Sequence, residues 1–310
     1  MSAGLSSNKP NGEDVEPFFF VNMADCQLGM LKGNKNWIQE KEMLLEGIEI
    51  VNKMKPKPKF VTMCGDLINA FPTKKNVSVR AGQTKDLKYS ISKLNKDIPF
   101  ICMCGNHDVG QTPTKETMEE YRKTWGRDYY SFFVNNCRMV VINSQIYKDS
   151  SKTGDDFIAQ EKWLAKEVNE EKERRDAPCI FFSHIPPFIL NKNEKESWSN
   201  LPVKHRKKLL EMSKLSGCVA WFCGHYHQNA IAYDEDLEII ISSAIGTAID
   251  SMGKDFSQGL IQPMKLQIGK NVSGFRIVHV NQMGVRHQFF TLNDAPTELN
   301  VNIFSDKNNL

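Results

Sequence analysis

The sequence lacks any apolar run that approaches the roughly 18 residues of a membrane-spanning helix. Its first 17 residues also lack the basic stretch followed by an apolar stretch that marks a secretory leader. Charge of one sign is not in excess, because 40 basic residues face 37 acidic ones and leave a net charge of +3. Because the two charges nearly balance, the composition does not indicate a basic surface that would bind nucleic acid. We therefore expect a soluble, cytoplasmic protein with neither a membrane nor a nucleic acid as its partner.

Cysteine is present, but not in the spacing of a metal or redox motif. Of the eight cysteines, the nearest pair, Cys102 and Cys104, is separated by one residue instead of two. Most lie within apolar runs, which is typical of reduced thiols in a core. Internal repeats are also missing, and 310 residues with 40% hydrophobic side chains suffice for one well-buried domain. We predict this domain over residues 17–292, between polar tails at 1–16 and 293–310.

Short apolar runs alternate with helical patterns along the chain. The runs are rich in Val, Ile and Phe, as buried strands are, and cover residues 18–24, 60–64, 99–104, 132–143, 179–183, 219–223, 237–242 and 275–280. Helical patterns cover residues 37–54, 87–94, 118–125 and 157–175. The alternation predicts an α/β fold in which two mixed β-sheets pack together between helices, a four-layer α/β/β/α sandwich.

Side chains that bind metals or transfer protons follow the ends of five of these apolar runs. The segments are Asp25-Cys26-Gln27, Gly65-Asp66, Gly105-Asn106-His107-Asp108, His184 and Gly224-His225-Tyr226-His227. Four of the seven histidines fall inside them. Strand ends meet at one rim of the sheet in open α/β folds, and active sites usually lie there. We therefore expect these side chains to converge.

The order and chemistry of the five segments favour a metal site over separate structural roles. A single aspartate after a strand is most often a cap or turn residue, and a single histidine is most often packed in a core. Caps need not cluster, however, whereas metal ligands must. In an extended segment residues i and i+2 point to one side, which pairs Asp25 with Gln27 and His225 with His227. Oxygen and nitrogen donors without a thiolate indicate two adjacent metal ions that act on a phosphate ester.

The ordered segments, over roughly residues 17–292, resemble the signature of the calcineurin-like metallophosphoesterases, and further stretches resemble a cytoplasmic serine/threonine-protein phosphatase branch of that family. The resemblance implies that one ion is held by Asp25, Gln27, Asp66 and His227, and the other by Asp66, Asn106, His184 and His225. Asp66 would bridge the two ions. His107 would approach the leaving oxygen, as a histidine outside the ligand set can donate a proton near neutral pH.

Two residues depart from the pattern of this family. Most members have histidine where this chain has Gln27, and an amide oxygen is a poorer donor than imidazole for a borderline cation. Many protein phosphatases have aspartate, which orients the catalytic histidine, where this chain has Asn69. We expect the metal position at Gln27 to be weak, and His107 to be modestly active or to rely on Asp108.

A basic run follows the polar stretch after His184. It comprises Lys204, Arg206, Lys207 and Lys208. Loops near the mouth of a site commonly carry specificity, so we predict that these residues attract an acidic phosphopeptide. The alternative is the solvated start of a helix after Pro202, because charge runs usually face water.

The residues leave two catalytic functions and one binding function open. We favour a binuclear enzyme that hydrolyses phosphomonoesters, a serine/threonine-protein phosphatase with phosphoproteins or phosphopeptides as substrates and two divalent cations (Mn, Fe, Zn or Mg) as cofactors. A monoester dianion brings more negative charge to two cations than a diester does. The same ligands would serve a phosphodiesterase acting on cyclic nucleotides or small diesters. A scaffold that binds phosphoproteins without turnover is supported by Gln27 and Asn69 alone.

Overall fold

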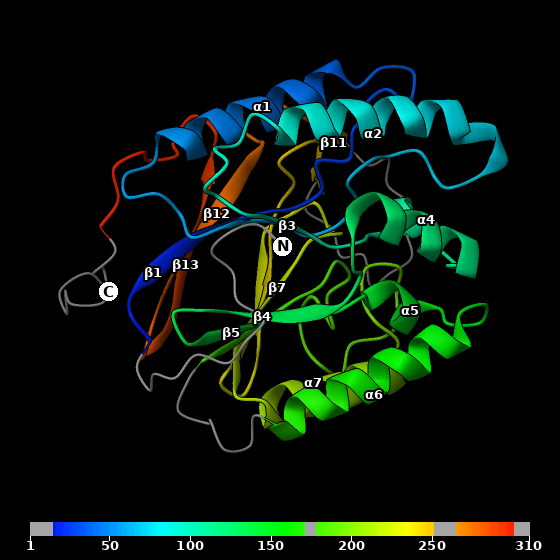
Figure 1. The fold of residues 1–310 in the computed structure, drawn as a ribbon, viewed down its shortest axis with the longest axis vertical. Coiled ribbons are helices and arrows are strands. Elements are labelled where there is room, and N and C mark those ends of the chain that lie inside the picture. Colours follow the sequence, from blue (N-terminus) through cyan, green and yellow to red (C-terminus); the bar gives the residue numbers. More distant parts are fainter. Residues whose placement is uncertain (1–14, 171–177, 251–264, 301–310) are drawn as a thin grey trace.

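Two mixed β-sheets pack face to face, and helices cover the outer side of each (Figure 1). The computed structural model describes residues 15–170, 178–250 and 265–300. Helices α1 (Ile38–Lys53) and α2 (Val77–Ile91) lie on one side, and α6 (Gly154–Glu170) and α7 (Val203–Leu215) lie on the other. The predicted four-layer α/β/β/α sandwich is therefore confirmed.

The first sheet has five strands in the order β13-β12-β1-β2-β3. Its strands are β1 (Phe18–Met23), β2 (Val61–Met63), β3 (Phe100–Cys102), β12 (Gly274–Asn281) and β13 (Gly284–Thr291). Strands β1, β2 and β3 run parallel, whereas β12 is antiparallel to both of its neighbours. The three parallel strands therefore end at the same edge.

The second sheet has six strands in the order β4-β5-β6-β7-β9-β8. Its strands are β4 (Tyr130–Val134), β5 (Cys137–Val141), β6 (Cys179–Phe182), β7 (Cys218–Cys223), β8 (Ala230–Asp234) and β9 (Leu237–Ile241). The four central strands are parallel, and the edge strands β4 and β8 are antiparallel. Shorter elements are η1 (Lys74–Asn76), α3 (Asn106–Val109), α4 (Lys115–Trp125), α5 (Ser144–Lys148), β10 (Ala248–Asp250) and β11 (Lys265–Gln267).

A group of phenylalanines lies within the core between the sheets. Phe20 of β1 stacks on Phe60 at a centroid distance of 4.6 Å and meets Phe182 and Phe222 of the second sheet edge-on, each at 5.7 Å. Its neighbour Phe19 faces the opposite way and packs in the cluster under α1 and α2. Both faces of β1 are thus buried, which explains why its sequence is apolar at every position except Asn22 and does not alternate.

Several predicted boundaries differ from the structure, two of them by a whole turn or more. The apolar run at 132–143 is two antiparallel strands, because Asn135 and Asn136 form a tight hairpin turn with φ of 45° and 66°. Asparagine is among the few residues that tolerate this left-handed region. The helix predicted at 87–94 begins ten residues earlier, at Val77, and ends at Ile91.

Residues 293–300, predicted as part of a C-terminal tail, pack on the domain. Leu299 donates its backbone N–H to Lys55 at 2.8 Å, and Lys55 pairs with Glu298 in a short β-bridge. Ala295 and Leu299 contact the apolar cluster beneath α1. The domain therefore continues past Leu292. Residues 1–14 and 301–310 of the predicted tails lie outside the described residues, whereas Val15 is buried.

All eight cysteines are free, and all but the partly buried Cys102 are buried. Burial raises the pKa of the Cys102 thiol to about 12, as expected for inert thiols in a core. In the parts of the chain that the structure describes, no helix is both long and apolar enough to cross a membrane.

Candidate metal centre

The five donor segments meet at the rim where the parallel strands of both sheets end. Loops after β1 and β2 carry Asp25 and Asp66, Asn106 begins α3 shortly after β3, and loops after β6 and β7 carry His184 and His225. The backbone there is unusual. Five of the seven predicted ligands have positive φ, namely Asp25 (50°), Gln27 (32°), Asp66 (47°), His225 (69°) and His227 (56°). Non-glycine residues rarely adopt this conformation, and such strain gathers at functional sites.

One group of donors surrounds His184. Asp66, His184 and His225 each offer a ligand atom, and the three atoms lie within 4.8 Å of one another. His184 Nε2 lies 3.4 Å from Asp66 Oδ2 and 3.0 Å from His225 Nδ1. Asn106 Oδ1 lies 3.1 Å from the same His184 nitrogen. These four residues, Asp66, Asn106, His184 and His225, are called the second metal position below.

A second group shares Asp66 with the first. Asp25, Asp66 and His227 offer ligand atoms within 4.8 Å of one another, and His227 Nε2 lies 3.4 Å from Asp25 Oδ1. Gln27 is 2% exposed, and its side-chain oxygen Oε1 is a buried atom without a hydrogen-bond partner. Asp25, Gln27, Asp66 and His227 are called the first metal position. An unpartnered buried oxygen is costly unless something else binds it, so Gln27 fits a ligand role.

Backbone carbonyls hold the imidazoles of both positions in one tautomer. His184 Nδ1 contacts the Cys64 carbonyl at 2.8 Å, and His227 Nδ1 contacts the Thr247 carbonyl at 2.6 Å. His225 Nε2 contacts the Trp198 carbonyl at 2.9 Å. A carbonyl only accepts, so each of these nitrogens donates its N–H, and the other ring nitrogen is the one directed at the site, where it can bind a metal when the ring is neutral. This arrangement is typical of metal-binding histidines.

Burial and neighbouring charges shift the pKa values of the histidines and aspartates of the centre strongly. Burial lowers the pKa of His184, but Asp66 and Asp25 outweigh it and raise the value to about 9. Burial, with His184 beside it, lowers the pKa of His225 to about 3. Burial raises the pKa of Asp25. Two buried carboxylates thus share one small volume and require positive charge, and the converging oxygens and nitrogens suit two divalent cations.

Gly105 lets two of the donor segments approach each other. A Cβ atom at this position would overlap the Asp66 carboxylate, whose Oδ1 accepts the backbone N–H of His107 at 2.8 Å. That hydrogen bond leaves Oδ2 to face the histidines. The glycine of the Gly-Asn-His-Asp segment is therefore needed for the close approach that allows Asp66 to be shared.

His107 lies at the edge of the donor cluster. Its Nε2 is 4.0 Å from Asp66 Oδ2, and its side chain is 19% exposed, whereas those of His184 and His227 are 0% and 4% exposed. The ring stacks on Phe71 at 4.1 Å, and Nδ1 donates to the backbone carbonyl of Asn69 at 2.5 Å. Position 69 thus orients His107 through its backbone and not through its side chain.

Asp108 has a structural role next to the centre. Its carboxylate accepts the backbone N–H groups of Gly105 at 2.8 Å and Leu67 at 3.1 Å. Burial and the neighbouring Asp66 raise its pKa to about 7. The expectation that His107 relies on Asp108 does not match these contacts, because Asp108 ties the Asp66 loop to the start of α3.

The basic run does not form one continuous surface. Arg206 is 0% exposed, and its guanidinium donates to the carbonyls of Lys192, Glu194 and Leu201. Its prediction as a substrate-binding residue is therefore wrong, since it braces the loop before α7. Lys208 is paired with Glu161 of α6.

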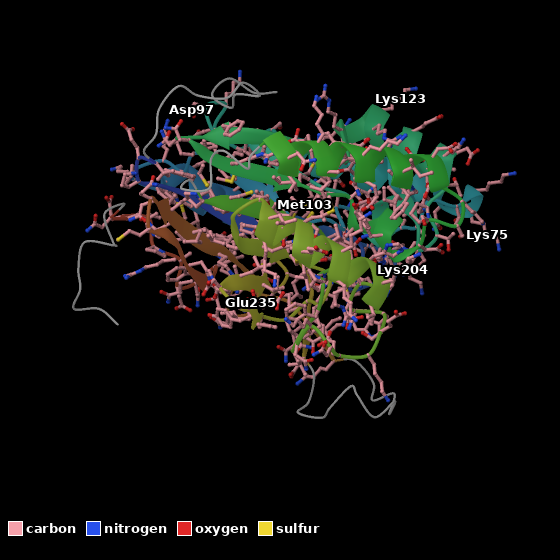
Figure 2. All side chains as sticks on the ribbon, turned by 90° about the horizontal axis from the view of Figure 1, so that it is seen from below. Lys75, Asp97, Met103, Lys123, Lys204 and Glu235 are labelled. Carbon is pink, nitrogen blue, oxygen red and sulfur yellow. The ribbon has the colours of Figure 1, made fainter. Side chains whose placement is uncertain are left out.

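Lys204, Lys207 and Lys208 are exposed, but Lys208 is the one paired with Glu161. Lys204 lies at the N-terminal end of α7, in the layer of α6 and α7 that faces the viewer in Figure 2. It follows Trp198, whose carbonyl contacts His225, by only six residues. The predicted helix start after Pro202 is confirmed.

Several residues that support the centre were not predicted from the sequence. Trp198 and Thr247 act through carbonyl groups, which every residue has, so no side-chain signal identifies them. Arg80 donates to the carbonyls of Ala70, His107 and Asp108 and so holds the His107 loop. Phe71 was identifiable only as an aromatic residue five positions after Asp66.

A two-sheet α/β sandwich with two clusters of carboxylate, amide and imidazole donors on a shared aspartate defines a metal-dependent phosphoesterase. Comparison with known proteins agrees. The sequence pattern of the family described as calcineurin-like phosphoesterase matches residues 22–229, and the chain belongs to this family.

Relatives with described activities resemble the chain over much of its length. The serine/threonine-protein phosphatase CPPED1 of Mus musculus is 35% identical over 297 residues, which cover 93% of this chain and 88% of the relative. The probable glycerophosphodiester phosphodiesterase GpdQ of Arcobacter nitrofigilis is 25% identical over 67% of this chain and 71% of its own. A crystal structure of a dimetal phosphatase from Danio rerio shares the fold, with a TM-score of 0.57 and 10% identity over 89% of this chain and 100% of that one.

Proposed function

We propose that the protein hydrolyses phosphoserine and phosphothreonine monoesters in proteins, with two divalent cations at the first and second metal positions. The observation that carries the proposal is the pair of donor clusters joined by Asp66. The serine/threonine-protein phosphatase named above, similar over 93% of this chain, supports the substrate class. Free, buried cysteines suit a reducing compartment, so we place the protein in the cytoplasm.

The residues divide between binding and proton transfer. Asp25, Gln27, Asp66 and His227 would hold one ion, and Asp66, Asn106, His184 and His225 would hold the other. When bound there, the two ions would supply positive charge for the phosphate oxygens and would make a water more acidic for attack on phosphorus. The chain fixes the ligand lone pairs beforehand, since each imidazole is oriented by a backbone carbonyl.

His107 would serve the leaving group. With Nδ1–H donated to Asn69, the second proton of its imidazolium sits on Nε2, the nitrogen that faces Asp66 across 4.0 Å. This nitrogen can pass the proton to the departing serine or threonine oxygen. Stacking on Phe71 keeps the ring plane fixed, so the proton is offered in one direction.

Residues at the mouth would select a peptide substrate. Trp198 is 44% exposed, and its ring lies 5.3 Å from that of His225. It offers an apolar contact to a peptide flanking the phosphate, while Lys204 and Lys207 attract acidic sequences. Divalent metal identity is left open by this donor set, which suits Mn, Fe and Zn and accommodates Mg.

The similarity to a glycerophosphodiester phosphodiesterase favours a second candidate, hydrolysis of diesters at the same centre. Steady-state kinetics on a phosphoserine peptide, a cyclic nucleotide and a bis-aryl diester, all with the same metal ion, separates the two. We expect the highest kcat/KM on the peptide. A diester hydrolysed as well as the peptide, or better, would replace the monoesterase assignment by the diesterase.

A further inference from the structure

We propose that a directional chain of four amide side chains turns the Gln27 amide so that its oxygen, and not its nitrogen, faces the first metal position. The four residues, called the amide relay, are Gln83, Asn34, Asn69 and Gln27. Gln83, Asn34 and Asn69 are then positioning residues for the metal. The inference rests on the proposed two-metal function, because it concerns how a ligand of that centre is oriented.

The direction of the relay is set at its far end by a backbone group. The N–H of Ala70 donates to Gln83 Oε1 at 3.0 Å. A backbone N–H can only donate, so the Gln83 atom that meets it must be the oxygen. The nitrogen of the same amide is therefore turned the other way, and Gln83 Nε2 donates to Asn34 Oδ1 at 2.9 Å. Gln83 is 0% exposed, so water does not compete for these bonds.

Each following amide inherits this direction. Asn34 Oδ1 also accepts from Asn69 Nδ2 at 2.8 Å, which leaves Asn69 Oδ1 to accept from Gln27 Nε2 at 3.1 Å. The Gln27 nitrogen is thereby committed to Asn69. Its oxygen is the atom left over, and it is buried without a hydrogen-bond partner. The direction of the Ala70 N–H thus determines which end of the Gln27 amide faces the first metal position.

The loop after β1 fixes the relay at a second point. The carbonyl of Gly29, which can only accept, lies 3.4 Å from Asn69 Nδ2 and takes the backbone N–H of Asn34 at 2.8 Å. A Cβ atom on Gly29 would overlap the Gln83 amide, so glycine is needed for this close approach. Both anchors, one donor and one acceptor, favour the same orientation of Asn69.

Orientation matters because an amide has two ends of nearly equal size and opposite character. An oxygen can bind a cation, whereas an –NH₂ group directs two partly positive hydrogens toward it. An imidazole at this position would need no such chain. The two departures from the family pattern, Gln27 and Asn69, are hydrogen-bonded to each other, so the orientation of one amide sets that of the other.

Two substitutions that add the same charge separate the relay from simple electrostatics. In Gln83→Glu both oxygens accept, so Asn34 must turn its nitrogen toward position 83, and Asn69 and Gln27 must turn in sequence. In Asn34→Asp the side chain still accepts from both neighbours, and the direction is kept. Each variant adds one negative charge near the centre, which by itself would tighten cation binding.

Calorimetric titration of the metal-depleted full-length protein with Mn²⁺ measures the outcome without relying on activity. We expect Gln83→Glu to weaken one of two sites by about 10- to 100-fold, the range for partners that orient a metal ligand. Asn34→Asp should bind as tightly as the unaltered chain or more tightly. Asn34→Gly removes the acceptor that Gln83 and Asn69 share, and glycine suits the φ of 67° at position 34. This variant should lose less metal affinity than Gln83→Glu.

A carboxylate at position 27 provides the control for a merely structural effect. The two oxygens of a glutamate carboxylate are equivalent, so turning the side chain does not change the atom that faces the metal. In a Gln27→Glu background, the change Gln83→Glu should therefore no longer weaken metal binding. Three results would each overturn the relay. Gln83→Glu could lower metal affinity equally in both backgrounds, or it could bind metal as tightly as the unaltered chain. Asn34→Asp could also lose as much metal affinity as Gln83→Glu does. An unaltered chain that binds fewer than two Mn²⁺ ions would instead overturn the proposed two-metal function.

Discussion

The two proposed metal positions differ in how their ligands are fixed. At the second position both imidazoles, His184 and His225, are oriented directly by backbone carbonyls. The first position has one such imidazole, His227, and a neutral amide whose direction depends on side chains 34, 69 and 83. The second position therefore depends on strand ends and backbone carbonyls, whereas the first also depends on amide side chains from the loops after β1 and β2 and from α2. We expect the first position to bind its ion more weakly.

The largest effect should come from the residue that the two positions share. Asp66→Asn removes the charge of the bridging carboxylate, so we expect activity to be abolished and metal content to fall at both positions. Metal analysis combined with turnover of a phosphopeptide measures this. Two tightly bound ions and normal turnover in the variant would show that Asp66 is not shared.

His107→Ala should lower turnover without touching either position. We expect both metals to remain and kcat to fall by about 10² to 10⁴ on phosphoserine peptides, the range for a lost general acid. With p-nitrophenyl phosphate, whose leaving group departs without a proton, the loss should be much smaller. Equal losses on both substrates, or loss of metal, would contradict the role in proton donation.

Gln27→His should reduce the difference between the two positions. Imidazole is a better donor than an amide oxygen for Mn, Fe and Zn, so we expect affinity at the first position to rise roughly tenfold with the second unchanged. Calorimetric metal titration of both forms measures it. Equal or weaker binding by the histidine variant would mean that residue 27 does not contact the ion.

The smallest effect should come from the exposed lysines at the mouth. Changing Lys204 and Lys207 to Gln should raise KM roughly two- to fivefold on acidic phosphopeptides only, since exposed charges such as these contribute about 0.2–0.5 kcal/mol each, the lower part of the usual range. Arg206→Ala is the matched contrast. It leaves three carbonyls, of which that of Leu201 is buried, without their donor and should lower the free energy of unfolding by about 1–3 kcal/mol, measurable by urea denaturation. If Arg206→Ala raised KM without lowering the free energy of unfolding, Arg206 would be a substrate-binding residue after all.

The arrangement of the rim could be predicted because it depends on rules that the sequence displays. Apolar runs marked the parallel strands, and donors placed directly after them had to meet where those strands end. The hairpin at Asn135 and Asn136 also carried a signal, two adjacent residues that tolerate positive φ. It was missed because the apolar runs on either side merge into one.

Other parts of the centre could not be predicted, for physical reasons. Charge alone gives no measure of burial, and Arg206 looks like its lysine neighbours until the loop carbonyls that surround it are known. Asn34 and Gln83 lie 49 positions apart and resemble ordinary surface amides. Their relation appears only when α2 packs against the β1 loop. Backbone carbonyls such as that of Thr247 carry no side-chain information at all.

A crystal structure of the protein grown with Mn²⁺, with anomalous scattering used to locate the metal, tests the two-metal centre most directly. We predict two peaks about 4 Å apart with Asp66 between them. One should lie against Asn106, His184 and His225, and the other against Asp25, His227 and the oxygen of Gln27. A single peak, or two peaks that do not share Asp66, would contradict the account.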